Sequence, residues 1–436
     1  IRRQRQMCIR DRYMFEGTLS AMGSNKFEKG NQYFFARAIG AAWVLSNESF
    51  LKDVENVDFL KLKASYGHLG YAGNTGFFLY RTNWKKGDKE EFRPTIGGNT
   101  TDLSRWGNPD LKWEYSNELN VGIEGLFFDN RLSTEINYFR ELRKNIIGVN
   151  NAKYAATGGD FIPYENIGEV MNQGFDAYVN WNDKIGKDFI YNVGFNVTYT
   201  KNELRKSNEL SNIEEYRKAI GRPTSTIFGW QAEGLFGKDI PLEGHPNQTF
   251  GNYQIGDIAY ADLNGDGIVD NNDQKSIGQS FPTTTMGIDV TLKYKGIGLY
   301  ILGTVTTGIT KLCTSSYYWN SGLNGYSVLA SDRYHPVNNP EGTQPRLTTM
   351  AADNNQRNST FWTENGSFFR LKNIELSYTL ANKSGKGIGK NYKFFLRGTN
   401  LFVLSGIKDL DPERILSGVT NYPTYRTVTG GLSISF

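Results

Sequence analysis

The fold is decided by residues 114–147, EYSNELNVGIEGLFFDNRLSTEINYFRELRKNII. In the first half, apolar side chains alternate with polar or small ones: Leu119, Val121, Ile123 and Phe127 against Glu118, Asn120, Gly122 and Glu124. Successive side chains of a β-strand point to opposite faces of a sheet, so this pattern predicts a strand with one apolar and one polar face. The second half repeats the pattern after Asp129-Asn130, which suits a tight hairpin turn.

The same alternation, regular or looser, recurs through the chain and predicts twelve strands. They comprise 13–23, 33–45, 59–70, 114–127, 131–147, the segments around 175–181 and 191–199, 286–294, 297–310, 373–380, 392–404 and the terminal segment that ends at Phe436. Glycine (48 residues), tyrosine (25) and phenylalanine (27) are abundant, as expected for many strands and turns. We therefore predict an all-β fold.

The connections between these strands alternate in length. Short links near 46–57, 128–130, 184–187, 296 and 381–390 alternate with longer ones at 71–112, 149–169, 203–282, 311–366 and 405–424; on the side of the longer links, only the first, 24–32, is short. Bacterial outer-membrane barrels have short periplasmic turns and long extracellular loops. The pattern predicts a transmembrane antiparallel up-and-down β-barrel, here a partial barrel of about 12 strands with long extracellular loops.

A soluble β-sandwich would show a similar alternation and is the alternative fold. Strand lengths near the ten residues that span a bilayer, aromatic residues near strand ends and the unequal loops all favour the barrel. The chain has no run of eighteen apolar residues, so the sequence predicts no transmembrane helix.

Several function classes are excluded by composition and motifs. The net charge is only +4 over 436 residues, and the basic residues are spread along the chain, which does not indicate a nucleic-acid-binding surface. Cys8 and Cys313 form no disulfide framework, and His68, His245 and His335 lack metal-ligand spacing. No phosphate-binding loop or GxSxG elbow occurs, so we predict no enzyme and no catalytic residues.

Residues 1–12 differ from the rest of the chain. Five of them are arginine, and the segment resembles translated sequencing-adapter read-through, so it is predicted to be non-native and is excluded from the fold. A genuine basic arm is the alternative interpretation. The predicted domain is therefore 13–436.

One loop has the ligand spacing of a calcium site. The candidate ligands in 262–273 are Asp262, Asn264, Asp266, Ile268 through its carbonyl oxygen, Asp270 and Asp273. Gly267 occupies the position that must bend sharply, whereas Asp273 replaces the usual glutamate. A solvated turn rich in Asp, Asn and Gly is the alternative. We expect Ca²⁺ there to act as a structural brace of an extracellular loop.

Aromatic residues in the loops are candidates for contact with a substrate. They are Trp84, Trp106, Trp230, Tyr317, Tyr318 and Trp319. Flat aromatic faces can stack on sugar rings, but packing within loops and aromatic belts at the membrane interface are alternatives. Acidic residues on the polar strand faces are predicted to line the barrel wall and not to form a catalytic pair; they are Glu118, Glu124, Glu135, Asp176 and Asp289.

The carboxyl terminus carries a further pattern. Thr429, Gly431, Ile434 and Phe436 have the spacing polar-x-Gly-x-x-apolar-x-apolar. This spacing resembles the assembly signal on the last strand of outer-membrane barrels.

Taken together, these segments resemble the SusC/RagA-type TonB-linked outer-membrane proteins of the Bacteroidetes over 13–436. The resemblance rests on LKLKASYGHLG (60–70), NPDLKWEYSNELNVGIE (108–124), IGEVMNQGFDAYVNW (167–181), GDIAYADLNGDGIVDNNDQKSIG (256–278), FFRLKNIELSYTL (368–380), RGTNLF (397–402) and YRTVTGGLSISF (425–436). Their order is that of the carboxyl-terminal part of the family's barrel.

The resemblance implies an active importer in the outer membrane of a Gram-negative bacterium. Such proteins have an amino-terminal plug, a TonB box that contacts the energy-transducing complex, and a SusD-like lipoprotein lid; their cargo is glycan or, in some members, peptide. The plug and the early strands are predicted to be absent from 13–436, since barrels of this class have roughly 22 strands. The alternatives are a secreted calcium-stabilised β-sandwich that binds carbohydrate and, within the same fold, a TonB-dependent receptor for siderophores or vitamins.

Overall fold

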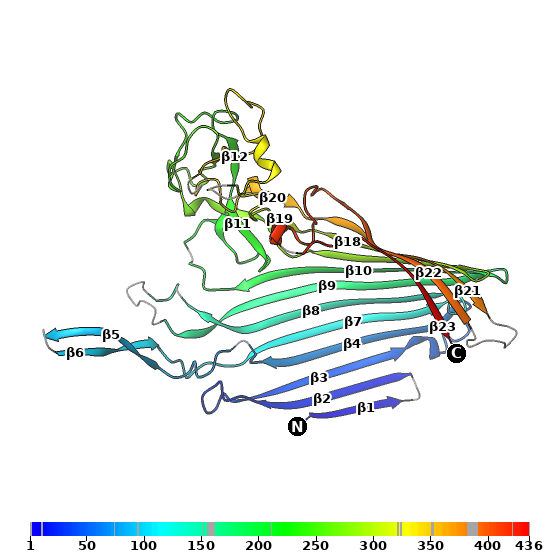
Figure 1. Cartoon of the computed structure of the whole chain (residues 1–436). Coiled ribbons are helices and arrows are strands. Elements are labelled where there is room, and N and C mark those ends of the chain that lie inside the picture. The colour runs from blue at the N-terminus through cyan, green and yellow to red at the C-terminus, as the bar shows by residue number, and fades with distance from the viewer. Residues whose placement is uncertain are drawn as a thin grey trace. The chain divides into compact units, whose positions relative to one another are not determined.

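The computed structural model describes residues 2–9, 12–73, 75–93, 96–150, 152–154, 162–210, 212–320, 322, 325–349, 353–381, 391–420 and 422–435. Strands dominate it (Figure 1). The helices are short 3-10 segments: η1 (Leu45–Asn47), η3 (Glu215–Arg217), η4 (Asn271–Asp273), η5 (Val328–Asp332), η6 (Thr360–Trp362) and η7 (Ile415–Thr420). Within the described ranges, none of these helices has the length and apolar character needed to cross a membrane.

All twelve predicted strands are present. They are β2 (Tyr13–Gly23), β3 (Tyr33–Val44), β4 (Val57–Tyr71), β7 (Glu114–Phe127), β8 (Leu132–Val149), β9 (Tyr164–Ile185), β10 (Phe189–Lys206), β17 (Thr284–Tyr294), β18 (Ile297–Thr307), β21 (Phe368–Ala381), β22 (Asn391–Ser405) and β23 (Thr427–Ser435). They hydrogen-bond in chain order within one sheet. A single up-and-down sheet confirms the predicted barrel architecture and not the sandwich.

A thirteenth strand, β1 (Arg2–Ile9), pairs antiparallel with β2. Its residues belong to the segment predicted to be non-native. Pairing with an open strand edge satisfies backbone groups whatever the origin of the segment, so that prediction stays a prediction.

The turns follow the predicted lengths. Between β7 and β8, Phe128, Asp129 and Asn130 all have positive φ. Between β17 and β18, Lys295 and Gly296 also have positive φ. Positive φ values match the twist of paired strands in a tight hairpin. The predicted link at 381–390 lies almost entirely outside the described residues.

The chain divides into two compact units. The first comprises Ile1–Val179, Thr200–Asn212 and Ala219–Thr224, and the second comprises Asn180–Tyr199, Ile213–Lys218 and Ser225–Phe436. In the first unit, the connection between β4 and β7 forms a hairpin of its own, β5 (Asn83–Arg93) with β6 (Ile96–Arg105). The β2–β3 and β4–β7 connections of this unit share a core of Phe27, Leu79, Leu111 and Trp113.

In the second unit, two long connections carry additional short strands. The β10–β17 connection holds β11 (Thr226–Trp230), β12 (Ala232–Leu235), β13 (Asn247–Gln248), β14 (Ile258–Tyr260), β15 (Ile268–Val269) and β16 (Gln274–Gln279). The β18–β21 connection holds β19 (Thr310–Leu312) and β20 (Thr363–Asn365). The pairs are β11 with β16, β12 with β14, β13 with β15 and β19 with β20. These loops are therefore folded structures (Figure 1).

Candidate functional site

The most elaborate structure outside the sheet is a loop cluster, which we define as residues 225–283, 308–367 and 406–420. A hydrophobic core joins its first two segments: Trp230, Leu235, Phe250, Ile258, Tyr260 and Val269 come from the first, and Tyr334 and Trp362 from the second. Each segment buries apolar side chains against the other. The two loops therefore fold as one body.

A buried polar network fixes how these two loops meet. Asp257 is 1% exposed; its Oδ1 accepts a hydrogen bond from Asn355 Nδ2 (2.8 Å) and lies 2.8 Å from Arg346 Nε. Asn355 Oδ1 accepts the backbone N–H of Ile258 (2.9 Å). Gln248 Nε2 donates to Asn354 Oδ1 (2.6 Å). Because a buried polar group without a partner is costly, this network stabilises one arrangement of the loops over others.

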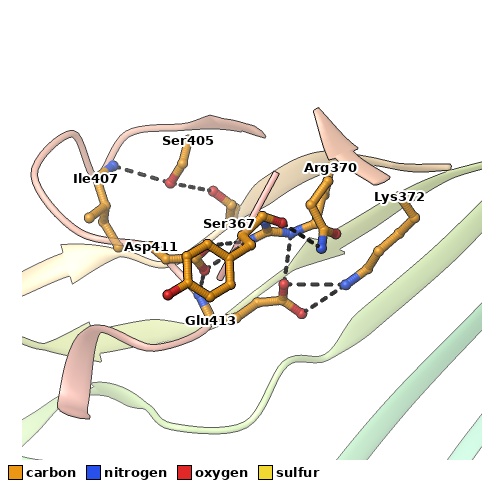
Figure 2. A network of polar contacts seen from close by, with 9 residues as sticks. Ser367, Arg370, Lys372, Ser405, Ile407, Asp411 and Glu413 are labelled. Atoms are coloured by element: carbon orange, nitrogen blue, oxygen red, sulfur yellow. Dashed lines mark hydrogen bonds and ion pairs between the residues drawn. The ribbon is translucent and has the colours of Figure 1, made fainter. Parts of the chain in front are cut away.

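The third segment is held to the sheet by an ionic clamp at the start of β21, shown in Figure 2. Arg370 is 2% exposed, and its Nη2 donates to both oxygens of Asp411 (2.7 and 2.8 Å). Its Nε lies 2.7 Å from Glu413 Oε2, and Lys372 Nζ lies 3.3 Å from the same oxygen. A guanidinium that engages a carboxylate with two bonds fixes geometry as well as charge. The clamp therefore docks residues 406–420 on β21.

Apolar contacts reinforce this docking. Ile407 and Ile415 bury against Cys313. Burial raises the pKa of the Cys313 thiol to about 12, so the thiol is neutral and unreactive at ordinary pH. Burial also lowers the pKa of Lys311, against the raising effect of the nearby Glu413 and Asp411.

The predicted calcium loop forms a turn whose carboxylates accept the loop's own amide groups. Asp262 accepts N–H groups of Gly265 (2.7 Å) and Gly267 (2.8 Å). Asp273 is fully buried and accepts those of Leu263 and Asp270 (both 2.8 Å). Gly267 has a φ of 85°, as its position in the motif requires.

These internal bonds explain the turn without a metal. Asn264 Oδ1 accepts the N–H of Asp266, Asp266 Oδ1 accepts that of Ile268, and Asp270 Oδ1 accepts that of Asn272. Within the described ranges, no three or more His, Cys, Asp or Glu side chains are gathered so as to hold a metal ion. The side chains fit a self-capped turn better than a ligand cage, and calcium stays a prediction.

The predicted aromatic residues fall into three environments. Trp230 is 6% exposed and packs inside the core of the loop cluster, so its ring is not presented to a ligand in this conformation. Tyr318 and Trp319 are half-buried against that core, and Tyr317 packs edge-on against Tyr318.

The other two aromatics lie in the first unit, where Trp84 on β5 and Trp106 just after β6 are 60% and 52% exposed. Trp84 and Trp106 thus belong to the first unit, and the other four predicted residues belong to the second. Their role in cargo binding stays a prediction.

Three of the five predicted acidic residues, Glu124, Glu135 and Asp176, are engaged in local pairs. Glu124 pairs with Lys61 and with Lys63, whose Nζ lies 2.6 Å from both Glu124 Oε1 and Glu135 Oε1. Asp176 accepts a hydrogen bond from Asn137 Nδ2 (2.8 Å). Such pairing fits side chains that line a barrel wall.

The terminal pattern has a packing explanation. Thr429, Gly431 and Ile434 lie on β23 opposite Arg397, Phe395 and Tyr392, and Phe436 lies outside the described residues. A Cβ on Gly431 would come within 2.3 Å of the Phe395 ring. Glycine at this position lets the ring lie over the backbone, and a larger residue would force the ring to move.

The outer surface of the loop cluster exposes isolated apolar side chains. In its first two segments, the most exposed of them are Val337 (80% exposed), Phe281 (72%) and Val328 (70%). Sequence reasoning missed both this surface and the clamp. Single exposed apolar side chains are common on protein surfaces, so a role for these in an interface is a proposal.

Comparisons with known proteins agree with this architecture. The family described as "TonB dependent receptor-like, beta-barrel" matches residues 11–301. TonB-dependent receptor P26 of Formosa agariphila is 28% identical, over 98% of this chain and 45% of its own length. TonB-dependent receptor SusC of Bacteroides thetaiotaomicron is 25% identical, over 98% of this chain and 42% of its own.

Among solved structures, the RagAB peptide importer in its "closed-closed" state is similar in fold. Its TM-score is 0.76 at 21% identity, covering 99% of this chain and 47% of the matched chain. The chain thus spans less than half the length of the relatives that it matches.

Proposed function

Because the chain belongs to the TonB-dependent receptor-like β-barrel family, we propose that it forms part of an outer-membrane importer that takes up oligosaccharides or peptides together with a SusD-like surface lipoprotein. The family consists of outer-membrane receptors and transporters and not of enzymes. The predicted localisation, the outer membrane of a Gram-negative bacterium of the Bacteroidetes type, follows from the same membership.

Two similarities support this choice within the family. The chain is similar along nearly its whole length to SusC and to the RagAB peptide importer. The cargo class, glycan or peptide, is proposed from this pair of relatives. The plug and the TonB contact would be supplied by parts of the receptor outside these 436 residues.

The observation that carries the proposal is the loop cluster. Long loops alone do not require a shared core, a buried Asp257–Arg346 pair or a clamped third segment. These contacts hold the loops in one conformation. Rigid loops present one surface, and a preorganised surface binds a partner with a smaller loss of conformational freedom. We propose that the exposed apolar side chains of this body form part of the lipoprotein contact.

Calcium has a limited place in this proposal. Bound at Asp262–Asp273, it would brace a loop of the cluster and would carry no step of transport. Its binding is tested separately from the partner contact.

Co-purification tests the proposed partner surface. The full-length receptor, expressed with a SusD-like lipoprotein from the same organism, is isolated through a tag on the receptor, and recovered lipoprotein is measured. The Val328→Glu, Val337→Glu double variant should recover less lipoprotein, because a charge would be desolvated in the contact. The control is Val54→Glu, which is also exposed but lies in the turn between β3 and β4. Equal recovery of lipoprotein with the wild type, the double variant and the control would show that Val328 and Val337 are not part of the lipoprotein contact.

A further inference from the structure

An apolar groove lies on the outward face of β2, β3, β4 and β7 in the first unit. Its volume is about 550 Å³, and its wall includes Phe15, Gly17, Ile39, Ala41, Ala64 and Tyr66. The register explains the hollow, since Gly17, Ala41 and Ala64 place little or no side chain between larger neighbours. Nothing lies within 4 Å of where a Cβ on Gly17 would stand.

The face that carries the groove is the lipid-facing one. Ile39, Tyr66 and Leu119 are paired in one row across β3, β4 and β7, and all are exposed. The opposite face of the same strands carries the Lys63–Glu124 and Lys63–Glu135 pairs. In a transmembrane barrel the apolar face contacts lipid, whereas the polar face lines the interior.

Two arginines interrupt this apolar face beside the groove. Arg37 lies two residues beyond Ile39 on β3 and is paired with Leu19, and Arg140 on β8 is paired with Leu119. Both side chains are exposed. Neither has an ion-pair partner among the described residues, in contrast to Arg370 and Arg397.

The depth of Arg37 makes the missing partner significant. On the outward face of β3, Trp43 and Tyr33 are ten residues apart, which is roughly 33 Å along the strand. At the usual strand tilt this length spans about 25 Å along the membrane normal, which equals the height of the apolar band of such barrels. Arg37 lies four residues below Tyr33, so it starts about 10 Å inside that band on the extracellular side. A cation is unfavourable at that depth unless an anion meets it.

We propose that the groove binds an acyl chain of a phosphate-bearing lipid of the outer leaflet, whose head group is held by Arg37 and Arg140. The groove offers almost only apolar surface, which suits hydrocarbon, and a guanidinium binds phosphate with two parallel hydrogen bonds. The two arginine backbones are separated by three strand spacings and by two residues along the strands, roughly 16 Å in all, and both long side chains can converge on one head group from opposite sides.

The charges and the groove can be tested by separate variants of the full-length protein. The protein is purified in detergent, exchanged into nanodiscs that contain phosphatidylcholine with a minor fraction of phosphatidylglycerol, and the lipid retained after detergent re-extraction is quantified by mass spectrometry. Wild type should enrich phosphatidylglycerol. The single variants Arg37→Gln and Arg140→Gln should each lower the enrichment about fivefold. Gly17→Phe should displace the lipid by filling the hollow while all charges remain.

Matched controls are Lys187→Gln, an exposed cation in the β9–β10 turn, and Ile288→Phe, added bulk on β17 away from the groove. Each protein is first shown to be folded by its heat-modifiable gel migration. Unchanged enrichment in both the arginine and the Gly17→Phe variants would overturn the proposal. A change of oligomeric state without a change in lipid would also overturn it and assign the groove to a second protein copy. The assay involves neither cargo nor lipoprotein, so its outcome is independent of the proposed import function.

Discussion

Removal of Arg370 should release the third segment of the loop cluster and leave the barrel intact. In Arg370→Met the guanidinium that engages both oxygens of Asp411, and that lies 2.7 Å from Glu413, is replaced by an apolar chain of similar length. Breaking a buried ion pair costs about 3–5 kcal/mol, because one charge is left without its partner. Asp411 and Glu413 are partly exposed and can regain water, so we expect a smaller cost than this, about 2–3 kcal/mol.

This cost converts to a roughly 30- to 150-fold shift of the docking equilibrium toward the undocked segment. Hydrogen exchange of the full-length protein measures it directly, since the amides of residues 406–420 should exchange faster by about that factor. The matched control is Lys372→Met. Its ion pair with Glu413 spans 3.3 Å between partly exposed side chains and contributes at most about 1 kcal/mol, which corresponds to about fivefold.

Cys313 provides a second readout of the same event. Because its pKa is raised to about 12 by burial beneath Ile407 and Ile415, alkylation should be slow at about pH 8 in wild type. It should accelerate in Arg370→Met when Cys8 is replaced by serine in both proteins. Equal exchange and equal alkylation in wild type and Arg370→Met would refute the clamp. An equal effect of Lys372→Met would show that the burial of Arg370 does not make its ion pairs stronger than that of Lys372.

Three further predictions concern other parts of the chain. Asp257→Ala removes the fully buried partner of the loop network and should cost about 3–5 kcal/mol in loop stability, so limited proteolysis should cut within 225–283 and 308–367 while the strands resist. Gly431→Ala should lower the heat-modifiable folded fraction, because its methyl group would collide with a phenylalanine ring at 2.3 Å; Gly430→Ala, whose nearest atom lies at 4.0 Å, is the control and should assemble normally. If the 262–273 loop binds calcium, the metal should slow loop proteolysis of wild type but not of Asp262→Ala, Asp266→Ala, whereas no effect of calcium on wild type would leave only the self-capped turn.

The strands were predictable because their signal is local. Period-2 alternation depends only on which face each side chain takes, so residues 114–147 predicted β7, β8 and the turn between them. The loop at 262–273 was also predictable as a tight turn, since its glycines and acidic residues act within a few positions of one another.

The loop cluster could not be predicted in the same way. Arg370 meets Asp411 across 41 residues, and Asp257 meets Asn355 across 98 residues. No periodicity connects these positions, and each looks like an ordinary loop or strand-end polar residue in the sequence. Trp230 illustrates the limit: its place in a loop suggested a binding residue, but the contact of two distant loops makes it part of a core.

Energised uptake measures whether the full-length receptor is a TonB-dependent importer. Cells that carry the full-length receptor and its lipoprotein are given labelled oligosaccharides and labelled peptides, and accumulation behind the outer membrane is followed with the TonB system intact, deleted, or deprived of proton-motive force. The proposed import function predicts accumulation of one of these cargo classes only when the TonB system is intact and energised. Accumulation that is unaffected by loss of TonB, or no accumulation of either class by an assembled receptor, would contradict it.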